Sequence, residues 1–205
     1  MTPNVPDTRG SQESQVAQGD HEIVTQRLSL TRLRPDDAAA LFTYRSDPAV
    51  ARYQTWLPAS LEEVRAFIGD QQSAAFDTPG EWSQLGLRLI GSPRLVGDAG
   101  IRIPADRPDE AEIGITIAPE HQGRGLATEA VAALLDHLFV VLGKRRVSAS
   151  VDPRNLASVA VLTKVGMHPE TYVPESVQIR GEWVDDLVFA LLQAEWRSRP
   201  APSDG

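Results

Sequence analysis

The segment Gln122-Gly-Arg-Gly125 constrains the fold of this chain more than any other stretch. It lies between a strand-like run, EAEIGITIA at 110–118, and a helical pattern at 124–142 whose apolar residues recur at three- and four-residue spacing. Backbone N–H groups without partners and the positive end of the helix dipole meet at such a junction, so an anion is stabilised there. Two glycines remove two Cβ atoms. The segment predicts a phosphate-binding loop, although alone it also fits an ordinary turn into a helix.

Two other glycine motifs fit this segment poorly. A Walker loop requires Lys and then Ser or Thr after its last glycine, but Leu126 follows Gly125. A dinucleotide-binding fingerprint requires Gly or Ala where Thr128 stands, and its strand runs directly into the glycines. Asp152 could imitate the ribose-binding acid of that fingerprint, so a dinucleotide oxidoreductase remains an alternative.

The pattern along the chain predicts one α/β (α+β) domain at residues 22–197. A strand at 27–34 is followed by two helices that begin at Pro35 and Ser60. The remaining elements are strands at 83–90, 95–103 and 110–118, the helix at 124–142, a strand at 146–151, a helix at 156–165 and a hairpin at 170–192. Short connections predict an antiparallel meander, with a βαβ crossover around the glycine segment.

Composition narrows the class of protein. The chain has no cysteine, which excludes disulfides and cysteine-based metal sites. Its four histidines are separated in the sequence, so no metal site is expected. A formal net charge of −8 disfavours a nucleic-acid partner and favours a cationic substrate. No apolar run approaches the roughly 20 residues of a membrane span, so the expected location is the cytoplasm. Residues 1–21 and 198–205 are polar, and we expect disordered tails there.

A second motif, NLASVAVLTKVGM, follows the strand at 146–151. Asn155 suits a helix N-cap and Gly166 a helix C-terminus, so each has a structural explanation alone. With both motifs in this order, residues 24–197 resemble the Gcn5-related N-acetyltransferase (GNAT) superfamily, and most of all its ribosomal-protein N-terminal acetyltransferase branch, the RimJ/RimL-like enzymes. The first sequence signature of the family matches residues 122–127, and Thr-Glu-Ala follows them as in this branch. The second signature matches at Asn155, Ser158, Lys164 and Gly166.

The resemblance implies a fold and a co-substrate. It implies a single-domain GNAT fold with a mixed, mostly antiparallel sheet of six to seven strands, a central splayed parallel pair and about four helices. It also implies acetyl-CoA as co-substrate, no metal, and neither nucleic acid nor membrane as partner. Many family members form homodimers, and the oligomeric state stays open. The positions that would bind acetyl-CoA are Ile115, Ile117, Gln122, Gly123, Arg124, Gly125, Leu126, Ala127, Asn155 and Ser158.

The reaction implied is direct attack of a primary amine on the thioester in a ternary complex. Glu112 is the candidate base, with a solvated strand residue as the alternative, and alternation places Glu112 and Gly114 on one face. Many family members use a tyrosine acid where Leu162 stands here, so Ser158 is the candidate donor to the leaving thiolate.

Acceptor recognition would fall to a loop between the first two helices. Its candidate residues are Arg52, Tyr53 and Trp56, and packing of Trp56 under the second helix is an equal interpretation. A protein N-terminus and a small-molecule amine both present the required group. A non-catalytic acyl-CoA-binding sensor, and an acyltransferase using a larger acyl group such as succinyl, stay open as alternatives.

Overall fold

The computed structural model describes residues 22–76 and 78–199, and these form one domain around a single eight-stranded sheet. The predicted tail at 1–21 and residues 200–205 of the second predicted tail lie outside the described residues. The strands are β1 (Ile23–Val24), β2 (Leu28–Arg32), β3 (Trp82–Leu89), β4 (Leu95–Arg102), β5 (Glu110–Ile117), β6 (Arg146–Val151), β7 (His168–Ile179) and β8 (Glu182–Leu192). The α-helices are α1 (Ala38–Arg45), α2 (Pro48–Ala51), α3 (Leu61–Ser73), α4 (Leu126–Asp136), α5 (Leu156–Lys164) and α6 (Gln193–Arg197).

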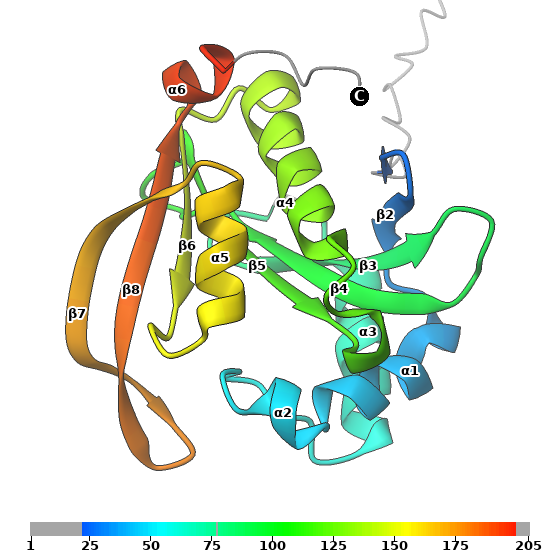
Figure 1. The fold of residues 1–205 in the computed structure, drawn as a ribbon. Coiled ribbons are helices and arrows are strands. Elements are labelled where there is room, and N and C mark those ends of the chain that lie inside the picture. Colours follow the sequence, from blue (N-terminus) through cyan, green and yellow to red (C-terminus); the bar gives the residue numbers. More distant parts are fainter. Residues whose placement is uncertain (1–21, 77, 200–205) are drawn as a thin grey trace, which may run out of the picture.

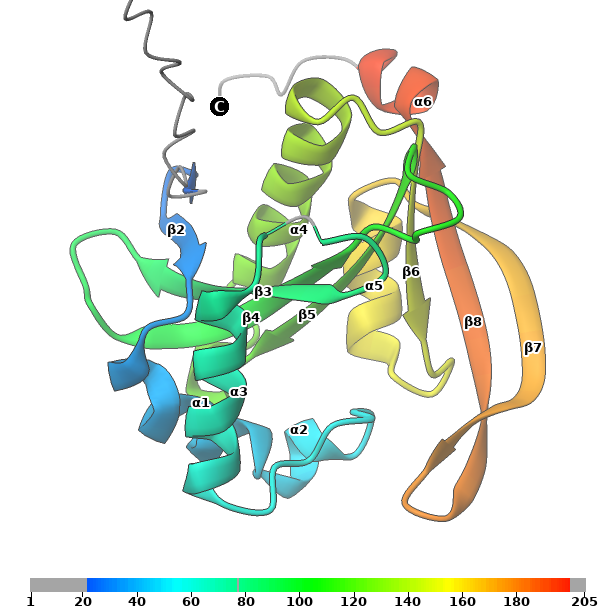
Figure 2. The ribbon, with the colours of Figure 1, turned by 180° about the vertical axis from the view of Figure 1, so that it is seen from behind.

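The strand order is β1-β2-β3-β4-β5-β6-β8-β7. All neighbours pair antiparallel except β5 and β6, which are parallel and joined through α4. The predicted meander and the crossover through α4 are therefore confirmed. A second crossover, from β6 through α5 to β7, was not predicted; its two strands are parallel, and β8 lies between them. Helices α4 and α5 lie over one face of the sheet (Figure 1), and the opposite view shows α3 over the other face (Figure 2).

Each face of the sheet has its own apolar cluster. Inward-facing residues of β2 to β6 pack against α4 and α5. Helix α4 presents Leu126, Ala130 and Leu134 to them on one apolar stripe. A smaller cluster on the other face joins α1 and α3 through residues such as Leu41 and Ile68. The sheet is thus covered on both faces.

A buried charge network ties α1 to the middle of the sheet. Asp98 of β4 has a fully buried side chain and accepts hydrogen bonds from Tyr44, at 2.6 Å, from Arg45 and from Gln84. Burial raises the pKa of Tyr44 well above its ordinary value, and the Asp98 charge adds to the effect, so the hydroxyl remains a donor. Arg45 also donates from Nη1 to Gln54 at 2.9 Å, which extends the network to the loop after α2.

The predicted architecture is confirmed, with some elements that the sequence pattern did not indicate. The sheet has eight strands rather than six to seven, because β1 is only two residues long and shows no alternation. Among the described residues there are six α-helices where about four were expected, since α2 and α6 have four and five residues, too few for a helical period. The predicted helix at 124–142 begins at Leu126 and continues as a π-helical turn at His137–Val141.

Replacing Arg45 by leucine should destabilise the fold strongly. The change leaves the Asp98 carboxylate buried without its cation, which costs about 3–5 kcal/mol in the free energy of unfolding. Urea denaturation measures the loss. The matched control is Arg65→Leu, which breaks the exposed pair with Glu62 and should cost less than about 1 kcal/mol. Equal losses in the two variants would show that the Asp98 network does not hold the fold.

Candidate active site

The central feature of the site is the separation of β5 and β6. Their parallel pairing covers three positions, from Glu110 with Arg146 to Glu112 with Ser148. Beyond them β5 continues beside β4 to Ile117, while β6 continues beside β8 to Val151. The facing edges carry no ladder pairing there, so their N–H and C=O groups can bond a ligand. The central splayed pair expected from the sequence is present.

The glycine segment lies at the N-terminus of α4, beside this opening. Gly123 has φ +71° and Gly125, the N-cap of α4, has φ +75°, and both residues are exposed. These left-handed conformations favour glycine. A Cβ at Gly123 would meet nothing within 4 Å, so the space in front of the loop is open. The loop therefore fits an anionic group that approaches the backbone.

The remaining predicted donor-side residues contribute backbone or bracing contacts. Gln122 donates to the Ile117 carbonyl at 2.9 Å, and Arg124 donates to the Glu120 carbonyl at 2.7 Å, so both side chains bond the loop itself. Their direct contact with a ligand stays a prediction. The side chains of Ile115, Ile117, Leu126 and Ala127 pack in or against the main core. Direct contact of these four residues with a ligand stays a prediction.

Helix α5 forms the other side of the opening. Asn155 is its N-cap and accepts a hydrogen bond from the Ser158 N–H at 3.2 Å. In the described part of the chain, the Ser158 hydroxyl makes no hydrogen bond, and the residue is half-buried. Leu162, at the position where many family members have a tyrosine, is buried in the main core. Ser158 therefore offers the available hydroxyl on this part of α5.

Glu112 stands where the two strands part. Its pairing with Ser148 is the last of the parallel ladder, and its carboxylate lies 3.4 Å from Arg102. Because Ala111 and Ile113 point into the main core, Glu112 and Gly114 face the side of the sheet that carries α1 and α3. Gly114 is exposed, and a Cβ there would meet nothing within 4 Å. The carboxylate thus borders open space.

Residues 52–56, within the stretch 52–58 that was predicted to bind the acceptor, lie on this second side. Tyr53 donates to the Arg154 carbonyl before α5, at 3.4 Å, and Arg52 stacks over the Tyr53 ring. Trp56 packs on Phe67 of α3 and donates to Glu63 at 3.0 Å, so the structural interpretation of Trp56 accounts for its contacts. Its role in acceptor binding stays a prediction.

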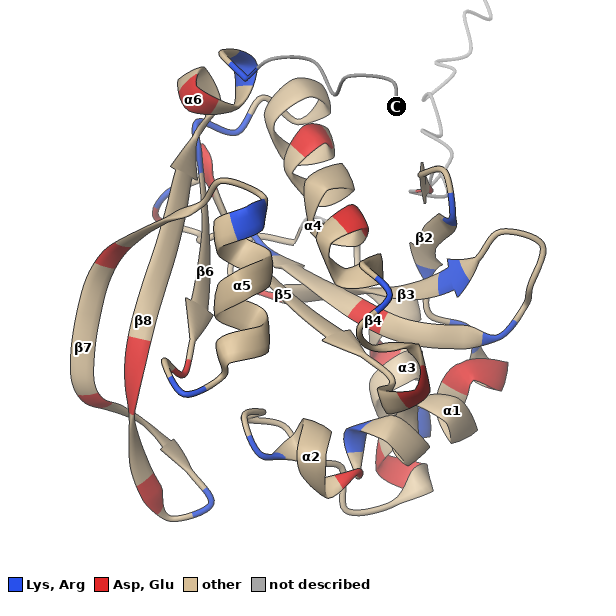
Figure 3. Cartoon of the chain, in the orientation of Figure 1, with Lys and Arg blue, Asp and Glu red and all other residues tan. Residues whose placement is uncertain are grey.

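Charges of both signs surround the opening, as the distribution over the elements shows (Figure 3). Asp152 is bonded by Arg154 at 2.6 Å, and this hydrogen bond holds the pKa of Asp152 below its ordinary value. Asp186 of β8 accepts a hydrogen bond from Ser150 of β6. The Asp152 carboxylate is therefore paired with a cation, whereas the Asp186 carboxylate is bonded by a neutral hydroxyl.

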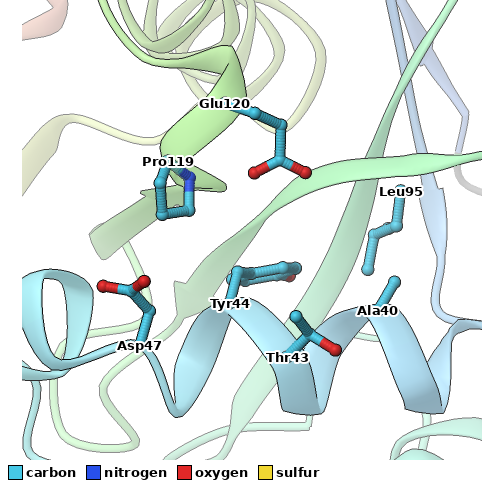
Figure 4. Close-up of a pocket in the computed structure, with 7 residues that line it drawn as sticks. All are labelled: Ala40, Thr43, Tyr44, Asp47, Leu95, Pro119 and Glu120. Atoms are coloured by element: carbon cyan, nitrogen blue, oxygen red, sulfur yellow. The ribbon is translucent and has the colours of Figure 1, made fainter.

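A separate pocket of about 330 Å³ lies on the β4 side of the opening. It is bounded by α1 and by the connection from β5 to α4, with the carboxylates of Asp47 and Glu120 at its edge (Figure 4). Its other lining residues are Ala40, Thr43, Tyr44, Leu95 and Pro119. The sequence pattern did not indicate this pocket, because its residues come from three separate segments.

Two further residues beside the glycine segment make contacts that the sequence did not predict, although one of them, Glu129, belongs to the Thr-Glu-Ala run after the glycines. Glu129, in the first turn of α4, accepts hydrogen bonds from Thr25 and from Arg27, and Arg27 also reaches the Arg124 carbonyl. Burial alone would raise the pKa of Glu129, but these hydrogen bonds outweigh it and lower the pKa. A polar pair separated by 102 residues has no local signal in a single sequence.

The family model of the acetyltransferase (GNAT) domain matches residues 27–168, more than half of the chain. The chain belongs to the GNAT acetyltransferase family. This GNAT domain is an acyl-CoA-dependent N-acetyltransferase, and the family uses acetyl-CoA as co-substrate. The dinucleotide oxidoreductase alternative is therefore wrong.

This GNAT domain is similar to three relatives that differ in how much of the chain they cover. It is 28% identical over 175 residues to an uncharacterised N-acetyltransferase, p20, from Bacillus licheniformis, covering 85% of this chain and 97% of p20. The solved structure of RimJ from Mycobacterium smegmatis with CoA-disulfide is similar at 26% identity and a TM-score of 0.72, covering 82% of this chain and 83% of RimJ. A spermidine N(1)-acetyltransferase from Vibrio cholerae is 32% identical over 89 residues, covering 43% of this chain and 51% of that enzyme.

Within residues 22–76 and 78–199, no helix has the length and apolar character that a membrane span requires. The same residues include no group of three or more His, Asp or Glu side chains arranged to hold a metal ion.

Replacing Gly123 by alanine should weaken acetyl-CoA binding beyond its effect on stability. A left-handed alanine costs roughly 1–2 kcal/mol, and a methyl group would enter the open space in front of the loop. The matched control is Gly143→Ala, which has φ +63°, the same open surroundings and a position at the far end of the α4 segment. Calorimetric titration with acetyl-CoA should show weaker binding only for Gly123→Ala, while thermal unfolding shows similar losses for both.

Proposed function

We propose that this chain transfers the acetyl group from acetyl-CoA to a primary amine by direct attack in a ternary complex. The observation that carries the proposal is the position of Glu112, a half-exposed carboxylate at the last paired residue before β5 and β6 separate. Donor and acceptor would approach this point from opposite faces of the sheet. The donor side has the glycine loop and α5, and the acceptor side has residues 52–56.

The glycine loop would hold the pyrophosphate of acetyl-CoA. The N–H groups at Gly123 to Ala127 converge at the positive end of α4, and the loop is open where the phosphates would lie. The backbone of Ile115 and Ile117 would then flank the pantetheine arm, and Asn155 would fix the start of α5 beside it. The thioester supplies the activated acetyl group.

Glu112 would accept a proton from the incoming amine. An amine whose pKa is about 8 to 10 is largely protonated at neutral pH, so producing the nucleophile costs roughly 1–4 kcal/mol, which a positioned carboxylate can supply. The Arg102 guanidinium lies 3.4 Å from this carboxylate and would orient it. Ser158 would donate a hydrogen bond to the sulfur of the leaving thiolate, whose pKa of about 8.5 demands little assistance.

The acceptor is a primary amine, either a protein N-terminus or a small-molecule amine. The family resemblance to RimJ supports the first kind of acceptor, and the similarity to a spermidine acetyltransferase over about half of that enzyme supports the second. The loop at residues 52–56 supplies the exposed Arg52 and the ring of Tyr53, which are recognition groups for either.

Thiol release from acetyl-CoA tests the proposed activity directly. The wild-type chain is incubated with acetyl-CoA and two amine panels, peptides with different N-terminal residues and polyamines, while free thiol is measured. We expect turnover with at least one panel, and the preferred panel identifies the acceptor class. Succinyl-CoA in parallel measures acyl preference. If no amine is acetylated while calorimetry shows acetyl-CoA binding, the sensor alternative replaces this proposal, and if neither occurs both fail.

Variants of the two proposed catalytic residues should differ in severity. Glu112→Gln removes the base and should lower kcat/KM about 10²- to 10⁴-fold at neutral pH, with partial recovery at higher pH where the amine is already neutral. Ser158→Ala removes one hydrogen bond to a good leaving group and should lower kcat about tenfold to hundredfold. Glu62→Gln and Thr163→Ala are the matched controls, because their side chains lie on exposed helix surfaces. A loss for Ser158→Ala equal to that for Glu112→Gln would contradict the assignment.

A further inference from the structure

Glu129 and Arg27 join two distant parts of the chain beside the glycine loop. The Glu129 carboxylate accepts from the Thr25 hydroxyl at 2.6 Å and from the Arg27 backbone N–H at 2.9 Å through one oxygen. Its other oxygen accepts from Arg27 Nε at 2.6 Å. Both oxygens are thus used, and the Glu129 side chain is only 18% exposed. The contacts fix the Arg27 guanidinium against the first turn of α4.

The same guanidinium reaches the glycine loop. Arg27 Nη1 donates to the Arg124 carbonyl at 3.0 Å, and this carbonyl belongs to the peptide between Arg124 and Gly125. Because a trans peptide is planar, its oxygen and its N–H point in opposite directions. The bond from Arg27 therefore directs the Gly125 N–H away from Arg27. That N–H is one of the donors in the proposed pyrophosphate site.

The loop needs such a restraint. Gly123 and Gly125 lie on both sides of Arg124, and glycine has the widest choice of backbone conformations, so the intervening peptide would rotate easily. A binding loop that is ordered before the ligand arrives loses less entropy on binding. The restraint from Arg27 acts on this peptide.

The ion pair also removes an unfavourable charge. Glu129 is a carboxylate in the first turn of α4, four residues after Gly125, and an unpaired carboxylate there would repel a phosphate. The Arg27 guanidinium at 2.6 Å compensates it. Arg124, which the resemblance implies as a residue that binds acetyl-CoA, donates to the Glu120 carbonyl and makes no ion pair with Glu129.

We propose that Arg27 and Glu129 are positioning residues for pyrophosphate binding, which orient the peptide between Arg124 and Gly125 and keep the start of α4 free of net negative charge. The inference rests on the proposed binding of acetyl-CoA at the glycine loop. Neither side chain is assigned contact with the ligand. Their effect should therefore be confined to co-substrates that carry a pyrophosphate.

The test compares acetyl-CoA with S-acetylpantetheine, which has the same thioester but no pyrophosphate. Arg27→Gln should lower kcat/KM for acetyl-CoA about tenfold or more relative to S-acetylpantetheine, through a higher KM with kcat within about twofold. Arg27→Lys should not restore the preference, because one ammonium group cannot replace the fork that bonds both Glu129 and Arg124. Glu129→Gln should also reduce the preference for acetyl-CoA over S-acetylpantetheine. Calorimetric titration with CoA should show weaker binding for these variants than for the wild type.

Arg32→Gln is the matched control. Arg32, five residues further along, also donates to two backbone carbonyls, those of Gln71 and Ala74 near the end of α3, away from the glycine loop. This variant should lower both kcat/KM values equally or not at all. Should Arg27→Gln fail to fold, Arg27→Lys tests the same expectation, with thermal unfolding as the check.

The outcomes separate the inference from the proposed function. Suppose that the wild-type enzyme prefers acetyl-CoA over S-acetylpantetheine and that Arg27→Gln and Arg27→Lys keep this preference. That result would overturn the positioning role alone. An equal loss of preference in Arg32→Gln would overturn it too, since the effect would then be general. A wild-type enzyme that neither binds CoA nor prefers acetyl-CoA would overturn the proposed pyrophosphate site itself and this inference with it.

Discussion

The separation of two parallel strands in the middle of a sheet is the constraint on which this structure depends. Strands β5 and β6 pair over three positions and then leave their facing edges without ladder partners. Such edges are tolerated because β4 and β8 complete the other edge of each strand, and because α4 and α5 cover one face. On the opposite face, the buried network around Asp98 ties α1 to β4 beside the opening.

The two halves of the site are held in different ways. The donor half is built mainly from backbone: left-handed glycines, the start of α4 and the capped start of α5. The acceptor half is built from side chains on a short loop, and its anchors come from elsewhere. Arg45 bonds Gln54, α3 supplies the packing for Trp56, and Arg180 at the tip of the β7–β8 hairpin bonds the Ala51 carbonyl. Backbone geometry therefore forms the proposed donor site, while several separate segments form the proposed acceptor site.

This division explains how far the sequence could predict the molecule. Motifs that act through backbone conformation leave local signals, so the glycine loop, the Asn155 cap and the antiparallel meander of β3 to β5 could all be inferred. Contacts between distant segments leave none. The Arg27 pair with Glu129, the Asp98 network and the pocket beside Glu120 all join residues far apart in the chain. The short elements β1, α2 and α6 were missed because they contain less than one clear hydrophobic period.

The anchoring of the acceptor loop has an evolutionary consequence. Gln54 and Trp56 are tied to the interior, whereas the neighbouring side chains of Arg52 and Thr55 are exposed and carry little of the packing. Mutations at the exposed positions can accumulate without unfolding the domain, because surface substitutions usually change stability by less than about 0.5 kcal/mol. If this loop binds the acceptor as proposed, substitutions at Arg52 and Thr55 would change the amine that is accepted while the fold and the glycine loop stay unchanged.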